Sequence, residues 1–99
     1  MQKIVDGLLY DTHDATCIAG KKNLIPGLLT FGDELLVKKL YMTKKGRFFF
    51  YTKSLECSWF SIDKEEDIIP CTEWEAKMYC MKWNYGNFMR IWGDKVERA

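Results

Sequence analysis

Two short apolar stretches open the chain on either side of an Asp-Gly pair. Ile4–Val5 and Leu8–Tyr10 flank Asp6 and Gly7. An Asp-Gly pair supplies the positive φ angles that a two-residue type I′ turn requires. The pattern therefore predicts a β-hairpin over residues 4–10.

The next segment carries residues that are typical of helix boundaries. Asp11 or Thr12 can cap the first amides of a helix, and Asp14 suits the positive end of its dipole. Gly20 can end such a helix. We therefore expect a short helix between Asp11 and Gly20. Residues 21–34, which hold one proline and two glycines, are interpreted as a loop held on the core by its aliphatic side chains.

The centre of the chain has the clearest strand pattern. Leu35–Thr43 and Arg47–Ser54 are rich in aliphatic, aromatic and β-branched residues, and Lys44–Gly46 separates them. A two-residue loop would force Lys45 into positive φ. A three-residue loop, with Gly46 as the left-handed bulge residue, avoids that strain and is the one we predict.

This register gives the hairpin two unlike faces. One face is mostly apolar and is expected to lie on the core; it consists of Leu36, Lys38, Leu40, Met42, Phe48, Phe50 and Thr52. The other interleaves aromatic rings with positive charge, and we call it the basic-aromatic face; it consists of Lys39, Tyr41, Thr43, Arg47, Phe49, Tyr51 and Lys53.

Past the hairpin the pattern changes from strand to helix. Cys57–Ile62 alternates and predicts a third strand, and the acidic run Asp63–Asp67 is interpreted as a solvated turn. Thr72 and Glu75 have the spacing of a capping box, which begins a helix that runs to about Trp83. Its expected buried stripe is Trp74, Met78 and Met81, with Ala76, Cys80 and Trp83 beside it.

One or two further helical turns are expected between Asn87 and Gly93, after a break at Asn84 and Gly86. Together these elements predict an α+β fold: a small antiparallel sheet built from hairpins, packed against a short N-terminal helix and a C-terminal helix. A chain of 99 residues is expected to form a single domain over residues 1–99.

The composition is that of a folded globular protein with a high content of aromatic residues. Hydrophobic residues make up 47% of the chain and charged residues 29%, which excludes a disordered or collagen-like chain. Aromatic residues reach 15%, enough to leave some for solvent or a partner. We find no export signal and no apolar run of membrane-spanning length, so a cytoplasmic protein without a membrane partner is expected.

The net charge of +1 conceals two oppositely charged segments. Residues 35–55 hold six basic residues and no acidic one, whereas residues 56–75 hold seven acidic residues against Lys64. The basic hairpin could meet phosphates or an acidic protein surface, and the acidic segment could engage a basic cleft. Alternatively, neighbouring strands neutralise one another across the sheet.

Catalytic and metal-binding patterns are weak. The cysteines Cys17, Cys57, Cys71 and Cys80 form no Cys-x-x-Cys pair and are expected to be reduced thiols. His13 and Cys17 have the spacing of a thiol–imidazole pair on a helix, although a lone histidine beside a capping carboxylate is usually part of the surface structure. We expect no enzyme activity, no metal and no cofactor.

The basic-aromatic face supports a nucleic-acid hypothesis. Rings that stack on bases beside lysine and arginine are typical of single-strand RNA binders. Residues 45–51 match the RNA-recognition signature poorly, however, because Arg47 stands where an aromatic belongs and Phe48 where a small residue belongs. The alternative is that Tyr41, Phe49 and Tyr51 are covered by the helix or form a second small core.

Several segments resemble a group of small accessory proteins carried by phages and mobile elements of Gram-positive bacteria. They are Lys3–Gly7, Tyr10–Thr12, Ala15, Ile18–Ala19, Leu40–Phe49 and Ile69–Ala76. The chain departs from that group at Leu55–Ile62, which is short and apolar instead of polar and glycine-rich. The resemblance implies a non-catalytic inhibitor of host defence machinery, such as an anti-CRISPR protein, and identifies no active residues.

Our leading hypothesis is binding to a host protein or ribonucleoprotein complex, with a nucleic-acid-binding module as the alternative. The candidate partner-binding residues are Lys39, Tyr41, Lys44, Lys45, Arg47, Phe49, Tyr51 and Lys53. A second candidate surface consists of Glu65, Glu66 and Asp67. An exposed edge strand could also pair two copies into a homodimer.

Overall fold

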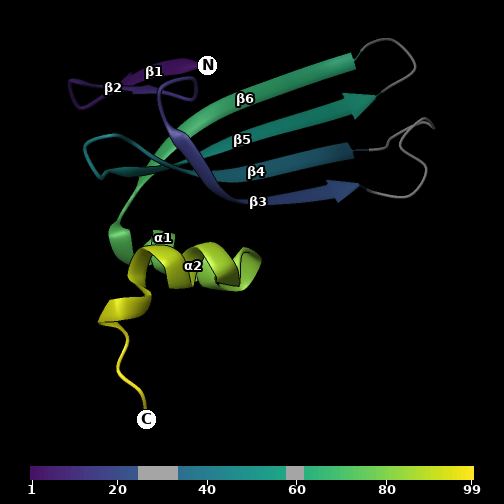
Figure 1. Cartoon of the computed structure of the whole chain (residues 1–99). Coiled ribbons are helices and arrows are strands. Elements are labelled where there is room, and N and C mark those ends of the chain that lie inside the picture. The colour runs from purple at the N-terminus through teal and green to yellow at the C-terminus, as the bar shows by residue number, and fades with distance from the viewer. Residues whose placement is uncertain (25–33, 58–61) are drawn as a thin grey trace.

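The computed structural model describes residues 1–24, 34–57 and 62–99, and its α+β architecture is shown in Figure 1. A two-stranded sheet and a four-stranded sheet, both antiparallel, precede two helices, and the four-stranded sheet has the order β3-β4-β5-β6. The elements are β1 (Gln2–Val5), β2 (Leu8–Asp11), β3 (Thr16–Leu24), β4 (Glu34–Met42), β5 (Phe48–Cys57), β6 (Ile62–Cys71), α1 (Glu73–Trp83), α2 (Tyr85–Trp92) and a short 3-10 helix η1 (Gly93–Lys95).

The N-terminal hairpin forms as predicted. Val5 of β1 pairs with Leu8 of β2, so the turn contains two residues, Asp6 and Gly7. Both adopt positive φ, at 51° and 77° respectively. These angles are those of a type I′ turn, the geometry for which Asp-Gly is suited.

The predicted register of the β4–β5 hairpin is also confirmed. Met42 pairs with Phe48 and Leu40 with Phe50. The amide of Gly46 donates to the carbonyl of Thr43 at 3.0 Å, and Gly46 has a φ of 81°. A three-residue loop therefore ends in a left-handed glycine, which spares the lysines that conformation.

The predicted N-terminal helix between Asp11 and Gly20 is wrong, because residues 16–24 form β3. The Asp11 carboxylate does accept an amide, that of His13 at 2.9 Å, but within a turn that follows β2. β3 then pairs with β4 and bulges at Ile18, between Cys17 and Ala19. The bulge lets the adjacent Ile18 and Ala19 both be buried, each 2% exposed, which a regular strand would not allow.

The interpretation of residues 21–34 as a loop is wrong for 21–24, which belong to β3, while residues 25–33 lie outside the described part. The third strand is also displaced from its predicted place at Cys57–Ile62: β5 ends at Cys57, β6 begins at Ile62, and residues 58–61 are outside the description. The acidic run is no turn, because it pairs with β5 along β6. The register then places residues of opposite charge across from each other on neighbouring strands, for example Lys53 of β5 opposite Glu66 of β6.

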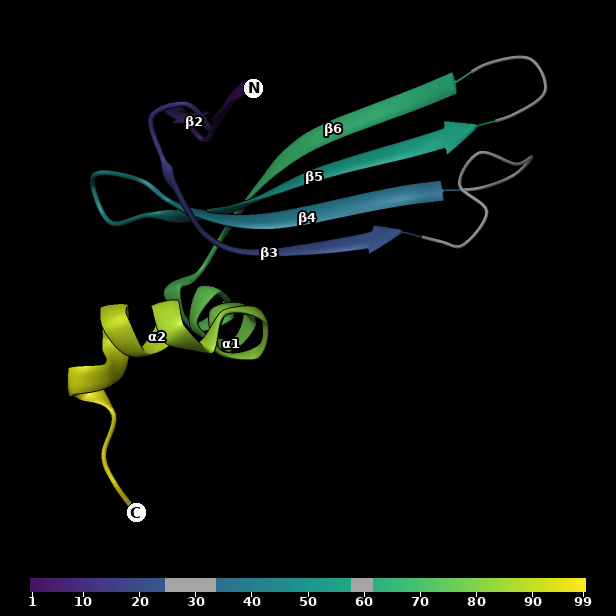
Figure 2. The ribbon, with the colours of Figure 1, turned by 45° about the vertical axis from the view of Figure 1, so that its right-hand side comes forward.

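Two separate cores cover the two sides of the four-stranded sheet. The core under the helices is formed by Ile18, Ala19, Leu40, Phe48, Phe50, Ala76, Cys80, Phe88 and Trp92. The core under the N-terminal hairpin is formed by Tyr10, Phe49 and Ile68, with Met1, Val5, Ala15, Tyr41 and Tyr51 packed against it. The helices lie near one end of the strands, and β3–β6 extend beyond them (Figures 1 and 2).

The boundaries of α1 agree with the prediction, and its buried face agrees in part. The Thr72 hydroxyl accepts from the Glu75 amide at 3.1 Å, so the capping box is present. Ala76 and Cys80 are fully buried, whereas Trp74 is 68% exposed. Small residues one turn apart let α1 approach the sheet closely. The large buried side chains that the helices add to this core, Phe88 and Trp92, come from α2.

α2 begins at Tyr85, two residues before the predicted start at Asn87, so Gly86 lies inside the helix and not in a break. It ends at Trp92, next to the predicted end at Gly93. Asn84 caps it, since its side-chain oxygen accepts from the Asn87 amide at 3.1 Å. The Asn87 side chain donates to the carbonyl of Ile18 at 2.8 Å, which ties α2 to the bulge in β3.

Candidate functional site

The rings of the basic-aromatic face form a second small core. Phe49 is fully buried, with its ring stacked on Tyr41 at 5.2 Å and meeting the edge of Tyr10 at 5.5 Å between centroids. Tyr41 in turn meets Tyr51 edge-on at 6.5 Å. The N-terminal hairpin therefore covers the surface on which bases or a partner were expected to stack.

Tyr51 is further fixed by a hydrogen bond. Its hydroxyl donates to Glu66 Oε2 at 2.9 Å. Burial, the bond to Glu66 and the charge of that carboxylate raise the pKa of Tyr51 to about 12. Burial also raises the pKa of Tyr41. Both rings serve packing in this structure, and the Tyr51 hydroxyl also makes an internal hydrogen bond.

The basic residues of the candidate site fall into two groups. Lys44, Lys45 and Arg47 are exposed at the turn between β4 and β5. Lys39 and Lys53 lie farther along the strands, on the other side of the Tyr41–Phe49 ring pair. Within the described residues none of the five belongs to an ion pair. The structure thus gives a basic turn and a separate pair of lysines.

The second candidate surface is not one acidic patch. Glu65, Glu66 and Asp67 are consecutive residues of a strand, so their side chains alternate between its two sides. Glu66 accepts from Tyr51, and Asp67 Oδ1 pairs with Lys3 Nζ of β1 at 2.6 Å. Two of the three carboxylates therefore serve contacts within the protein.

The Lys3–Asp67 pair predicts an acid-dependent part of the stability. The bond from Lys3, with that from the Ile68 amide, lowers the pKa of Asp67 below its ordinary value. A carboxylate whose pKa is lower in the folded state than in the unfolded state stabilises the folded state at pH values above the unfolded-state pKa. This contribution is lost as the pH falls through the folded-state pKa. The unfolding free energy of Asp67→Asn should therefore fall less than that of the unchanged protein as the pH is lowered from about 5 to about 3.

Urea unfolding at a series of pH values measures this slope. Glu65→Gln is the matched control, because Glu65 lies on the same strand and makes no described ion pair. An unchanged slope in Asp67→Asn would show that the ion pair contributes nothing in solution.

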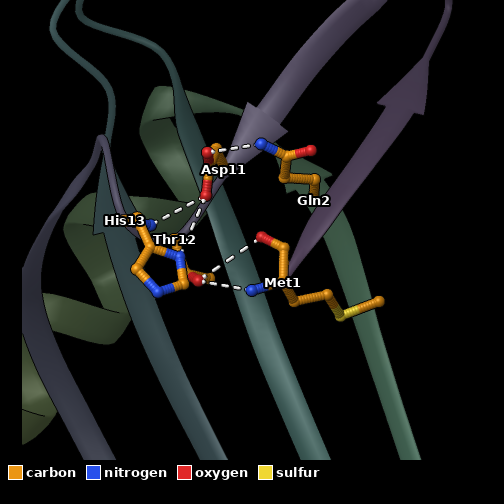
Figure 3. Close-up of polar contacts among 5 residues, drawn as sticks. All are labelled: Met1, Gln2, Asp11, Thr12 and His13. Carbon is orange, nitrogen blue, oxygen red and sulfur yellow. Dashed lines mark hydrogen bonds and ion pairs between the residues drawn. The ribbon is translucent and has the colours of Figure 1, made fainter.

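The residues around His13 hold the open end of the N-terminal hairpin together (Figure 3). The Met1 amine donates to Thr12 Oγ1 at 3.0 Å, and Gln2 Nε2 donates to Asp11 Oδ2 at 2.8 Å. The bond from Gln2, with that from the His13 amide, lowers the pKa of Asp11. The His13 imidazole is exposed and 3.4 Å from Asp11.

The helical spacing proposed for a thiol–imidazole pair does not exist, because His13 lies in a turn and Cys17 in β3. Burial and the charge of Glu75 raise the pKa of the Cys71 thiol to about 12, and burial also raises that of Cys80. Such thiols stay protonated and are poor nucleophiles. Among the residues that the structure describes, no cluster of three or more metal-ligating side chains occurs.

The sequence interpretation missed a groove between α1 and the sheet, which we call the α1–sheet groove. Its volume is about 550 Å³, within the range of ligand and peptide sites. The residues that line it include Lys38, Phe50, Trp74, Glu75, Met78 and Lys82. The sequence holds a signal for it, because Trp74, Met78 and Lys82 follow one another at helical spacing, but Trp74 and Met78 are predicted, together with Met81, to be the buried stripe.

Lysine ammonium groups lie over the rings of this groove. Lys38 Nζ is 4.4 Å from the centroid of Phe50 and 5.3 Å from that of Tyr79, and Lys82 Nζ is 5.3 Å from that of Trp83. The Tyr79 hydroxyl donates to the Lys38 carbonyl at 2.9 Å, which fixes α1 against β4. The groove therefore combines apolar area with two cations.

The described helices include none that is long and apolar enough to cross a membrane. β3 and β6 are the outer strands of the four-stranded sheet, and pairing of two copies along one of them stays a prediction.

Comparison of the chain with protein-family models, with curated proteins and with solved structures finds no match.

Proposed function

We propose that this protein acts without catalysis, by binding a partner protein through the outer surface of its two helices. The observation that carries the proposal is the exposure of large side chains there: Trp74 is 68% exposed, Tyr85 62% and Met89 41%. Trp, Tyr and Met are enriched in protein interfaces, and Trp and Tyr supply much of the binding energy.

The resemblance to accessory proteins of phages and mobile elements supplies a context for this binding. The partner in our proposal is a host complex that targets foreign nucleic acid, such as a CRISPR–Cas effector, and binding inhibits it. An inhibitor needs only to occupy a surface, so the weak catalytic patterns of the sequence are no obstacle. The context remains an analogy between sequences.

A nucleic-acid-binding module is the second candidate, and the basic turn favours it. Lys44, Lys45 and Arg47 are exposed and could contact phosphates. Phe49 is buried, however, and Tyr41 and Tyr51 pack beneath the hairpin. Without rings to stack on bases, such a module would bind through phosphate contacts alone, and protein binding is therefore the stronger proposal.

Plasmid interference tests the proposed function. Producing the protein in bacteria whose CRISPR–Cas complex targets a plasmid should restore transformation by that plasmid, and the purified protein should co-elute with the complex. The double variant Trp74→Ala/Tyr85→Ala should weaken binding at least about tenfold, as expected for loss of interface anchors.

Ile4→Ala is the matched control, because Ile4 is 71% exposed but lies on the N-terminal hairpin. It should restore transformation as well as the unchanged protein does. If the protein restores transformation against none of the types of targeting complex tested, the proposal is overturned. If Ile4→Ala loses as much binding as Trp74→Ala/Tyr85→Ala, the choice of surface is overturned.

A further inference from the structure

The two lysines of the α1–sheet groove reach it from different elements. Lys38 belongs to β4 and Lys82 to α1, and the exposed Trp74 and the half-buried Met78 line the same groove. In the part of the chain that the structure describes, neither lysine has a carboxylate partner. An apolar groove is thus flanked by two unpaired positive charges.

An acidic residue, Glu75, also lines the groove, and its carboxylate accepts hydrogen bonds within the capping box of α1. Glu75 Oε1 accepts from the Thr72 amide at 3.2 Å and from the Thr72 hydroxyl at 3.0 Å. The negative charge is held at the N-terminal end of α1, where the helix dipole also stabilises it. Two ammonium groups against one carboxylate leave the groove with a net positive charge, and that carboxylate lies in the first turn of α1.

We propose that the α1–sheet groove binds an acidic, apolar segment of the partner protein. An aromatic or aliphatic side chain of that segment packs against Trp74 and Met78, and carboxylates beside it pair with Lys38 and Lys82. The apolar contact supplies the affinity, and the charges fix the orientation and exclude basic partners. This inference rests on the proposed function, because it names the chemistry of the partner at a groove that shares Trp74 with the proposed binding surface.

A nucleic-acid strand suits this groove less well. Phe50 is only 8% exposed, and the ammonium groups of Lys38 and Lys82 lie over ring faces on which bases would stack. Carboxylates, in contrast, can approach each ammonium group from the solvent side while the ring stays below it. The contacts in the groove therefore favour a protein segment.

Selection from a random peptide library displayed on phage tests the inference without knowledge of the partner. The full chain should enrich peptides that carry aromatic or aliphatic residues beside Asp or Glu. A synthetic peptide of the enriched type should bind Trp74→Ala and Lys82→Glu at least about tenfold more weakly than the unchanged protein. Selection on Lys82→Glu should lose the preference for acidic peptides.

Lys45→Glu is the control for charge. It makes the same change in net charge at the β4–β5 turn, outside the groove, and should leave peptide affinity within about twofold. Trp74 is mostly exposed, so its replacement should leave the fold intact, which thermal unfolding of each variant checks.

Three results would overturn the inference: no enriched peptide, enrichment without acidic residues, or equal weakening by Lys45→Glu. An oligonucleotide that displaces the peptide and binds Lys82→Glu more weakly would instead assign the groove to nucleic acid. If the groove fails these tests while plasmid interference is still blocked, the proposed function survives without it. If peptides bind the groove but interference is unaffected, only the inhibitory role falls.

Discussion

Replacing Phe49 by alanine should lower the free energy of unfolding by about 3–5 kcal/mol, the usual cost of truncating a fully buried phenylalanine. The ring of Phe49 lies between those of Tyr10 and Tyr41 and is fully buried. The loss removes both the buried area and two ring contacts. Urea unfolding followed by circular dichroism measures it.

The same variant separates the core from a binding surface. Ile4→Ala, at an exposed position of the hairpin, should change the unfolding free energy by less than about 0.5 kcal/mol. If Phe49→Ala instead keeps its stability but loses salt-dependent binding to oligonucleotides, the basic-aromatic face is a recognition surface after all. The nucleic-acid alternative would then replace protein binding.

The β4–β5 hairpin was predictable because its register is set locally. Gly46 is the residue that accepts a left-handed conformation after Lys44 and Lys45, and this fixes the pairing of Met42 with Phe48. Every other pair of the two strands follows from that one. The capping box of α1 was equally local, since it depends on two residues three positions apart.

β3 was missed because its structure depends on a distant strand. Asp11 and Gly20 have side-chain and backbone properties that suit either a helix or a turn and strand. Pairing with β4 across a long connection decides between them, and the bulge at Ile18 conceals the alternation that would signal a strand. Neither feature can be seen within residues 11–20 alone.

The groove was missed because apolar side chains surround α1 on most sides. A helix of that kind does not indicate which stripe faces the sheet, and the larger residues were assigned to the core. The structure buries Ala76 and Cys80, the smaller residues beside the predicted stripe, and leaves Trp74 exposed. That choice depends on α2, whose Phe88 and Trp92 fill the core that the small residues of α1 leave open.

Trp92→Ala should destabilise the protein by about 3–5 kcal/mol, as much as the loss of Phe49 on the other side of the sheet. Trp92 is 3% exposed, and its ring centroid lies 5.6 Å from that of Phe48 and 5.7 Å from that of Phe88. Trp74→Ala is the matched control, because it removes an exposed tryptophan and should cost less than about 0.5 kcal/mol.

The Trp92 variant also tests whether the two cores form one cooperative unit. Both lie on β5, where neighbouring residues Phe48 and Phe49 belong to opposite cores. Loss of Trp92 should therefore lower the unfolding midpoint equally for tryptophan fluorescence and for the near-ultraviolet dichroism of the tyrosines under the hairpin. If the tyrosine signal keeps its original midpoint, the hairpin core folds independently of the helices, and the prediction of a single domain is wrong.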